Sequence, residues 1–104
     1  HFTDYYFVLA LDYGGHDEIL RAVKKMNDVS IENMDDYLDT CVLPHPNPDL
    51  IIRTSGEERL SGFMTWQSEY SELYFSRSFF PDFGPEELEK ALSEFKDRKR
   101  RFGK

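Results

Sequence analysis

The sequence predicts an α/β protein with an open, mostly parallel sheet and flanking helices. Two kinds of segment alternate along the 104 residues. Short, almost wholly apolar runs are typical of strands that are buried on both faces of a parallel sheet. Between these runs lie stretches in which apolar residues recur at helical spacing. Strand and helix signals that alternate in this way favour a parallel sheet covered by helices.

The amino-terminal part of the chain predicts one strand and two helices. The strand covers Tyr5 to Leu11, which reads YYFVLAL, and a glycine pair follows it. A helix is expected from Asp17 to Met26, because its apolar residues form one stripe. Its acidic residues lie in the first turn and its basic residues in the last, as the helix dipole favours. Ser30 is the predicted cap of a shorter helix that runs to about Thr40.

Two further strands are predicted after a stiff, proline-rich connector at residues 44–48. They cover Asp49 to Arg53 and Glu72 to Phe75. Between them, Thr54 to Ser61 is a polar loop, and the aromatic-rich segment Gly62 to Tyr70 is either irregular or one short helix. Ligands of open parallel sheets bind outside the carboxyl ends of the strands, so the polar loop is the first place to look for a site.

The last predicted element is a helix that begins at Pro85, after a turn at Pro81 to Gly84. Proline is favoured at the first position of a helix, where its missing N–H costs nothing. Apolar residues recur along this segment at helical spacing, and we expect them to face the core. The expected core stripe consists of Leu88, Ala91, Leu92 and Phe95.

Charge and composition exclude some classes of function. The net charge of -7 argues against general nucleic-acid binding, which needs a basic face. A single cysteine, Cys41, has no partner for an internal disulfide and indicates a reducing, cytoplasmic location. No apolar stretch approaches the roughly 20 residues that span a bilayer. The opening residues do not resemble a signal peptide, and a first residue other than Met suggests a fragment or a processed chain.

The polar loop carries the most informative chemistry. Arg53 directly precedes it, and it holds Arg59 together with hydroxyl groups and a glycine. Guanidinium groups bind phosphate oxygens in bidentate fashion, and hydroxyls and loop amides can complete such a cradle. The alternative is a surface loop in which the arginines pair with Glu57 and Glu58. The pattern by itself leaves both interpretations open.

The order of motifs resembles that of the cis-prenyltransferases, the family of undecaprenyl diphosphate synthase. The resemblance rests on PDLIIRTSGEERLSGFMTWQSEYSELYFSRSFFPDF at residues 48–83, on RRFG at residues 100–103 and on YGG at residues 13–15. It implies that residues 1–104 form the carboxyl-terminal half of a single cis-prenyltransferase domain. Asp12 and His16 depart from the family, which more often has Asn and Arg at these positions.

The resemblance implies roles for individual residues. Arg53, Arg59 and Ser61 would hold isopentenyl diphosphate, and Glu72 would help to bind Mg²⁺. From the sequence pattern alone, without the resemblance, we would interpret Glu72 as a solvated carboxylate at a strand edge. Arg101 and Gly103 of the closing motif would reach the same site in a neighbouring subunit, which requires a homodimer.

The resemblance also implies the reaction. An enzyme of this family transfers prenyl groups: isopentenyl diphosphate is condensed sequentially, in cis, onto an allylic prenyl diphosphate, which yields a polyprenyl diphosphate lipid carrier. The expected aspartate for the allylic diphosphate lies in the family's amino-terminal half and has no counterpart here, so no catalytic residue is assigned. We expect this chain alone to be inactive and to need an amino-terminal half. The six basic residues among residues 96–104 also allow a peripheral contact with an anionic membrane.

Two other interpretations compete with an enzyme half. The chain could be a non-catalytic partner subunit of a heteromeric cis-prenyltransferase that stabilises an active relative. It could also be an unrelated phosphate-binding α/β module. Retention of Arg53, Arg59, Ser61 and Glu72 argues against a mere partner subunit.

Overall fold

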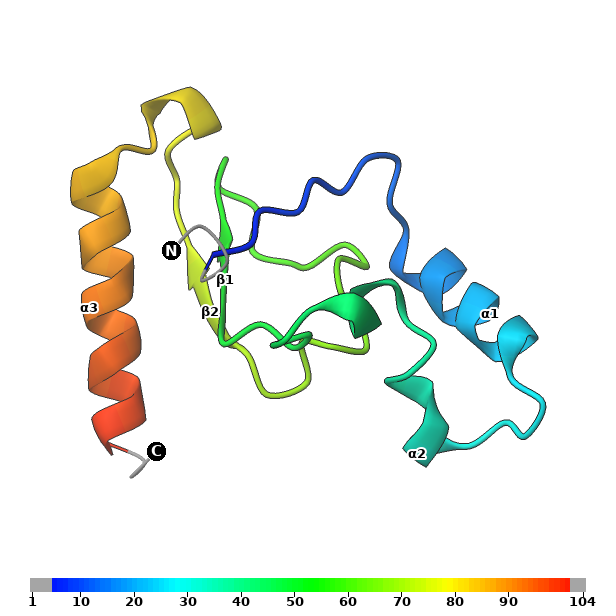
Figure 1. Cartoon of the computed structure of the whole chain (residues 1–104). Helices are drawn as coiled ribbons and strands as arrows, with labels where there is room; N and C mark the ends of the chain where they lie inside the picture. Colours follow the sequence, from blue (N-terminus) through cyan, green and yellow to red (C-terminus); the bar gives the residue numbers. More distant parts are fainter. Residues whose placement is uncertain (1–4, 102–104) are drawn as a thin grey trace. The chain divides into compact units, whose positions relative to one another are not determined.

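A computed structural model describes residues 5–101 of the chain, with side chains up to residue 99. Contacts divide the chain into two compact units. One unit combines the chain up to Asn47 with Ser61–Glu69, and the other combines Pro48–Leu60 with the chain from Tyr70 onward. The elements in order are α1 (Gly15–Lys25), α2 (Ile31–Met34), η2 (Asp39–Val42), β1 (Leu50–Arg53), β2 (Glu72–Phe75), η3 (Phe80–Asp82) and α3 (Pro85–Arg101) (Figure 1).

The first unit is organised around α1, which confirms the predicted helix. Its first turn is acidic and its last turn is basic, so the charges at both ends suit the helix dipole. One face of α1 packs on the segment that contains α2. The buried apolar residues of this unit are Ala22, Met26, Met34 and Leu38, with Trp66 packed against them.

A buried carboxylate connects the segments of the first unit. Glu18 on α1 is 1% exposed. Its carboxylate accepts hydrogen bonds from the Tyr13 hydroxyl, from the Asp39 backbone N–H at 2.7 Å and from the Gln67 amide at 3.0 Å. A buried charge is tolerated when donors surround it in this way. Burial, followed by the contact with Glu18, raises the pKa of Tyr13.

The second predicted helix is shorter than expected. Ser30 does cap α2, because its side chain accepts from the Asn33 N–H at 3.2 Å. The helix ends at Met34 and not near Thr40, so the predicted length is wrong. The Asp39 amide donates to Glu18 and not to a carbonyl one turn back along the chain, and η2 begins at that point.

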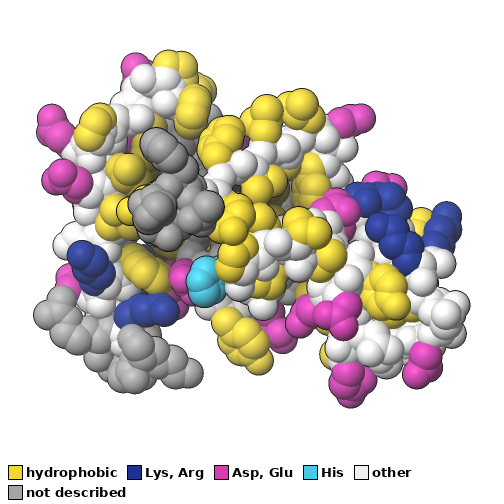
Figure 2. All heavy atoms as spheres, viewed as in Figure 1, with side chains coloured by type: hydrophobic (Ala, Val, Ile, Leu, Met, Phe, Trp, Pro, Cys, Tyr) yellow, Lys and Arg dark blue, Asp and Glu magenta, His cyan; other side chains and the backbone are white. Residues whose placement is uncertain are grey.

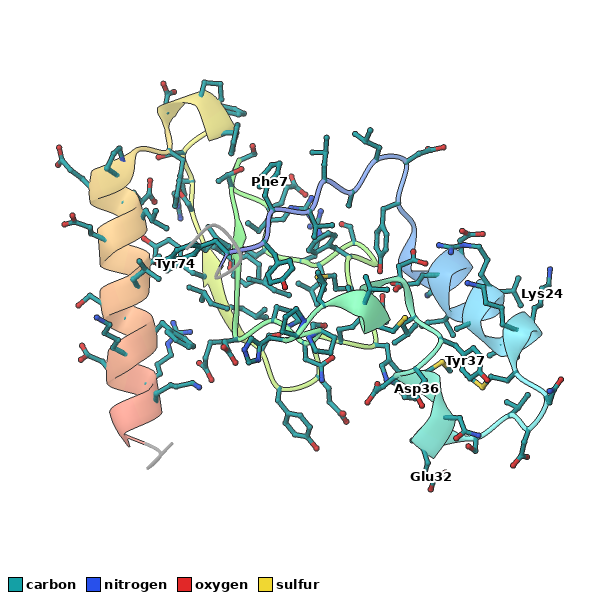
Figure 3. All side chains as sticks on the ribbon, in the orientation of Figure 1. Phe7, Lys24, Glu32, Asp36, Tyr37 and Tyr74 are labelled. Atoms are coloured by element: carbon teal, nitrogen blue, oxygen red, sulfur yellow. The ribbon has the colours of Figure 1, made fainter. Side chains whose placement is uncertain are left out.

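The prediction of a strand at residues 5–11 is wrong. Residues 5–11 do not form a strand in the structure, and the side chain of Phe7, labelled in Figure 3, is 90% exposed. Apolar side chains lie on the visible surface along this segment, drawn in yellow (Figure 2). An apolar run becomes a buried strand only when neighbouring strands satisfy its backbone. Within residues 5–101, β1 and β2 pair only with each other.

The second unit contains a parallel pair of strands, as predicted. Leu50 pairs with Glu72 and Arg53 pairs with Phe75, and the two strands lie side by side (Figure 1). Ile51 and Tyr74 are the buried residues of this pair. The α/β class and the parallel pairing are confirmed, although the described sheet has two strands.

Helix α3 begins at Pro85, as predicted, but it buries the expected apolar stripe only in part: Ala91 is buried, Phe95 is half-buried, and the two leucines are exposed. Ala91 is 1% exposed, whereas Leu88 and Leu92 are 41% and 43% exposed. The expectation that both leucines face the core is wrong. Polar groups attach this helix instead, because Arg98 donates to the Leu73 carbonyl at 2.8 Å and Glu87 accepts hydroxyl groups at the other end of the helix.

The remaining segments differ little from expectation. Residues 62–70 fold as successive turns without a helix, and η3 occupies the predicted turn before α3. None of the helices among residues 5–101 is both long and apolar enough to cross a membrane.

We predict that Gly15→Ala destabilises the chain. A Cβ at this position would lie 1.9 Å from the Gly62 carbonyl oxygen and 2.5 Å from the Thr65 hydroxyl, so backbone would have to move. Denaturant unfolding should show a loss of about 1–3 kcal/mol, the usual range for overpacking. Gly14→Ala is the control, because its Cβ would meet nothing closer than 3.8 Å. Equal unfolding midpoints for the two variants would contradict the prediction.

Candidate functional site

The polar loop brings the two predicted arginines together. Arg53 is the last residue of β1, and its guanidinium donates to the carbonyl oxygen of Arg59 at 2.8 Å. Arg59 pairs with Glu57 at 2.6 Å, and its side chain is 69% exposed. The alternative of a surface loop predicted ion pairs between the arginines and the loop glutamates, and one such pair forms, between Arg59 and Glu57. Such an exposed ion pair contributes little and is easily exchanged for another anion.

Two amides of the loop are not available to a ligand, against expectation. The Ser55 N–H donates to the Ser78 carbonyl at 2.7 Å, and the Gly56 N–H donates to the Ser76 carbonyl at 2.9 Å. Both loop residues adopt left-handed backbone, with φ of 70° at Ser55 and 75° at Gly56. This conformation is uncommon for a residue other than glycine and persists where surrounding contacts impose it. Here the carbonyls of residues 76 and 78 impose it.

A carboxylate on α3 holds the segment that supplies those carbonyls. The Ser76 and Ser78 hydroxyls donate to the two oxygens of Glu87 at 2.5 Å and 3.0 Å. The Tyr74 hydroxyl lies 3.5 Å from the same carboxylate, on the side of β2 that faces α3 (Figure 3). The hydrogen bond from Ser76 is the main cause that lowers the pKa of Glu87. Burial is the main cause that raises the pKa of Tyr74.

This carboxylate network was not predicted from the sequence. A glutamate in the first turn of a helix is ordinarily explained by the helix dipole, and that explanation needs no tertiary partner. The available signal is the Ser76-Arg77-Ser78 spacing directly after a strand. Two hydroxyls two residues apart, directly after a strand, can share one acceptor.

The structure does not bring Glu72 to the loop arginines. Glu72 is the first residue of β2 and Arg53 is the last of β1. In the parallel register Arg53 pairs with Phe75, three residues beyond Glu72, which corresponds to about 10 Å along the strand. The Glu72 carboxylate lies 3.5 Å from the Arg98 guanidinium, and both side chains are about one third exposed.

The other predicted site residues fall elsewhere. Ser61 belongs to the first compact unit, whereas Arg53 and Arg59 belong to the second. The side chain of Arg101 lies outside the described side chains, and Gly103 lies outside the described residues. The roles implied for these residues therefore stay predictions.

The chain by itself offers Mg²⁺ a single carboxylate at the predicted position. Among residues 5–101 no group of three or more His, Cys, Asp or Glu side chains is arranged to hold a metal ion. Mg²⁺ prefers six oxygen ligands and commonly binds through one or two carboxylates, phosphate oxygens and water. Glu72 fits that pattern only when a diphosphate supplies further ligands.

Two cavities lie within the units. In the second unit, a cavity of about 350 Å³ beside β2 and α3 is lined by cations and carboxylates, among them Arg77, Lys90, Arg98, Glu58 and Glu94. The opposite charges offset one another, so this cavity is not a purely anion-binding pocket. In the first unit, a cavity of about 360 Å³ is lined mainly by apolar side chains from residues 8–11, 42–43 and 63–64.

Comparison with known proteins identifies the class. Residues 1–103 match the family model described as "Putative undecaprenyl diphosphate synthase". The chain belongs to this prenyltransferase family.

Individual relatives agree with this assignment. The chain is 48% identical to an isoprenyl transferase of Aquifex pyrophilus over 99% of its own length and 46% of the relative. It is 45% identical to the tritrans,polycis-undecaprenyl-diphosphate synthase (geranylgeranyl-diphosphate specific) of Methanocaldococcus jannaschii, over 99% of the chain and 41% of the relative. The chain thus spans less than half the length of these curated relatives.

Solved structures show the same fold. A probable undecaprenyl diphosphate synthase from Campylobacter jejuni superposes with a TM-score of 0.74 at 37% identity, over 90% of this chain and 45% of that one. Lavandulyl diphosphate synthase from Lavandula x intermedia, in complex with dimethylallyl diphosphate, gives a TM-score of 0.72 at 35% identity, over 80% and 40%.

We predict that Ser76→Ala raises the pKa of Glu87, because the largest stabilisation of the charged form is removed. The folded-state pKa lies below the ordinary value of 4.5, so this carboxylate stabilises the fold above that pH and loses its contribution as the pH falls through the folded-state pKa. Carboxyl-carbon shifts in an NMR pH titration would report the change. Ser93→Ala on the exposed side of α3 is the control, and an unchanged titration of Glu87 in Ser76→Ala would refute the assignment.

Proposed function

We propose that this chain supplies the isopentenyl diphosphate half-site of a cis-prenyltransferase. The observation that carries the proposal is the hydrogen bond from the Arg53 guanidinium to the Arg59 main-chain carbonyl at the carboxyl end of β1, in a chain that belongs to the undecaprenyl diphosphate synthase family. In the proposed enzyme, isopentenyl diphosphate condenses in cis onto an allylic prenyl diphosphate. Repeated condensation yields a polyprenyl diphosphate lipid carrier.

The charge of the loop suits a diphosphate. A diphosphate monoester carries about three negative charges near neutrality and needs several fixed donors. Arg53 is held in place by the Arg59 carbonyl, which uses one of its five N–H groups and orients the rest. Arg59 is exposed and pairs with a surface carboxylate, Glu57, that a diphosphate can displace. Three of the four relatives compared above are diphosphate synthases by name, which agrees with this ligand class.

Further residues complete the proposed site. The hydroxyl of Ser61 would bind the same diphosphate, and Arg101 and Gly103 would reach the site of a neighbouring subunit in a homodimer. Mg²⁺, when bound at Glu72 together with diphosphate oxygens, would neutralise charge on the diphosphate. We further propose that residues 1–104 form the carboxyl-terminal half of one domain and need an amino-terminal half for activity. The proposed location is the cytoplasm, with a peripheral contact to the membrane that receives the lipid product.

The protein contributes mainly position in the proposed reaction. The bond between the first allylic carbon and its diphosphate oxygen breaks, and diphosphate leaves with the electron pair. The terminal alkene carbon of isopentenyl diphosphate bonds to that allylic carbon, and loss of a proton creates the new cis double bond. Arg53 and Arg59 would hold the isopentenyl diphosphate group so that its alkene faces the allylic carbon. No covalent bond to the protein is required.

We predict that Arg53→Ala weakens binding of isopentenyl diphosphate tenfold or more, because a charge-assisted hydrogen bond contributes about 1.5–3 kcal/mol. The measurement is an amide-shift titration of the 104-residue chain with isopentenyl diphosphate and Mg²⁺. Shifts should appear at residues 53–61 and near Glu72 and should vanish in the variant. Lys24→Ala, an exposed cation on α1, is the control for net charge.

Either result is informative. Loop shifts that depend on Arg53 support the half-site. Binding that falls equally in Arg53→Ala and Lys24→Ala would indicate only nonspecific attraction and would contradict it. Full absence of shifts at millimolar ligand would mean that these residues form no binding site without the amino-terminal half or the tail of a neighbouring subunit.

A further inference from the structure

We propose that Glu87 is a positioning residue for the diphosphate-binding loop, which it controls through Ser76 and Ser78. The consequence for ligand binding rests on the proposed function, whereas the mechanical link stands on contacts within the second unit alone. Glu87 contacts neither loop arginine in the described contacts, so its action is indirect.

The first link joins α3 to the segment after β2. Ser76 and Ser78 donate to opposite oxygens of the Glu87 carboxylate, at 2.5 Å and 3.0 Å. The Ser76 hydroxyl oxygen also accepts from the Ser78 N–H at 3.1 Å. Ser76 is 2% exposed, so its hydroxyl is shielded from competing water. The carboxylate therefore fixes both the side chains and the local turn of this segment.

The second link joins the same segment to the loop. The carbonyls of the two serines that contact Glu87 are the acceptors for the loop amides: Ser76 for Gly56 at 2.9 Å, and Ser78 for Ser55 at 2.7 Å. Each serine thus holds α3 with its hydroxyl and the loop with its carbonyl. A shift of the serine pair moves both loop acceptors together.

The third link is the conformation that these acceptors impose. Ser55 has φ of 70°, which costs energy for a residue with a side chain, and Gly56 follows with φ of 75°. This left-handed pair reverses the chain so that the Arg59 carbonyl returns to the Arg53 guanidinium at 2.8 Å. Loss of the amide acceptors would release the strain and separate the two arginines.

Glu87 has the right chemistry for this role. A carboxylate presents two acceptor oxygens to two hydroxyl donors, and it is favourable in the first turn of a helix. Glutamine keeps one acceptor and replaces the other with a donor, to which a serine hydroxyl can rotate and accept, so Glu87→Gln should keep both contacts in weaker, uncharged form. Alanine loses both. The two variants are therefore expected to form a graded series.

The test measures amide hydrogen exchange by NMR in the 104-residue chain, without ligand. Glu87→Ala should speed exchange at Ser55 and Gly56 about tenfold or more. The reason is that loss of a hydrogen bond to a charged group changes an opening equilibrium by about a factor of ten or more. Glu87→Gln should give an intermediate increase. Glu89→Ala, which removes an exposed carboxylate from the same turn region of α3, is the matched control and should change neither amide.

A second readout is the affinity for isopentenyl diphosphate with Mg²⁺, where Glu87→Ala should weaken binding about tenfold and Glu89→Ala should not. The Ala91 amide reports on α3 itself. If exchange at Ala91 rises in Glu87→Ala, the helix itself has loosened in that variant. The exchange rates of the Ser55 and Gly56 amides in Glu87→Gln then test the positioning role. Unchanged exchange at both loop amides in Glu87→Gln and Glu87→Ala would overturn the positioning role.

The two proposals fail separately. If the unaltered chain binds no isopentenyl diphosphate but Glu87→Ala still frees the Ser55 and Gly56 amides, a half-site in the isolated chain is refuted and the link from Glu87 to the loop is supported. If the chain binds the diphosphate through Arg53 and the Glu87 variants bind it equally well, the half-site holds and the functional role of Glu87 is refuted.

Discussion

The second unit depends on backbone hydrogen bonds that continue the pairing of β1 and β2 beyond both ends of the two strands. The pairing starts before the strands, where the Glu72 N–H donates to the Asp49 carbonyl at 2.9 Å, and it continues after them, where the Ser76 N–H donates to the Arg53 carbonyl at 2.8 Å. The loop amides then pair with the segment after β2. Because four-residue strands provide few ladder bonds, this continuation determines where the loop and its arginines lie.

Local signals in the sequence predicted much of the fold. β2 coincides with the predicted strand, and the starts of β1, α1 and α3 lie within two residues of the expected positions. Caps, prolines and charged first turns act within a few residues, so they can be read without knowledge of the tertiary structure. The apolar run at residues 5–11 misled because hydrophobicity indicates a preference for burial but not whether a neighbouring strand is available.

The candidate site was predictable in its residue types and less so in its geometry. The arginines of the polar loop were expected to serve one site, and the Arg53 guanidinium does contact the main chain of Arg59. That Glu72 lies at the opposite end of the strand pair follows from the register, which depends on long-range pairing. Likewise, the use of the Ser55 and Gly56 amides by the protein itself depends on a segment some twenty residues away in the sequence.

The polar attachment of α3 makes this helix sensitive to changes in length. Glu87 and Arg98 are eleven residues apart, about three full turns, so both face β2 and its continuation. One residue inserted or deleted between them would rotate one anchor by about 100° relative to the other and shift it by about 1.5 Å. Along this stretch, evolution can exchange side chains more readily than it can add or remove residues.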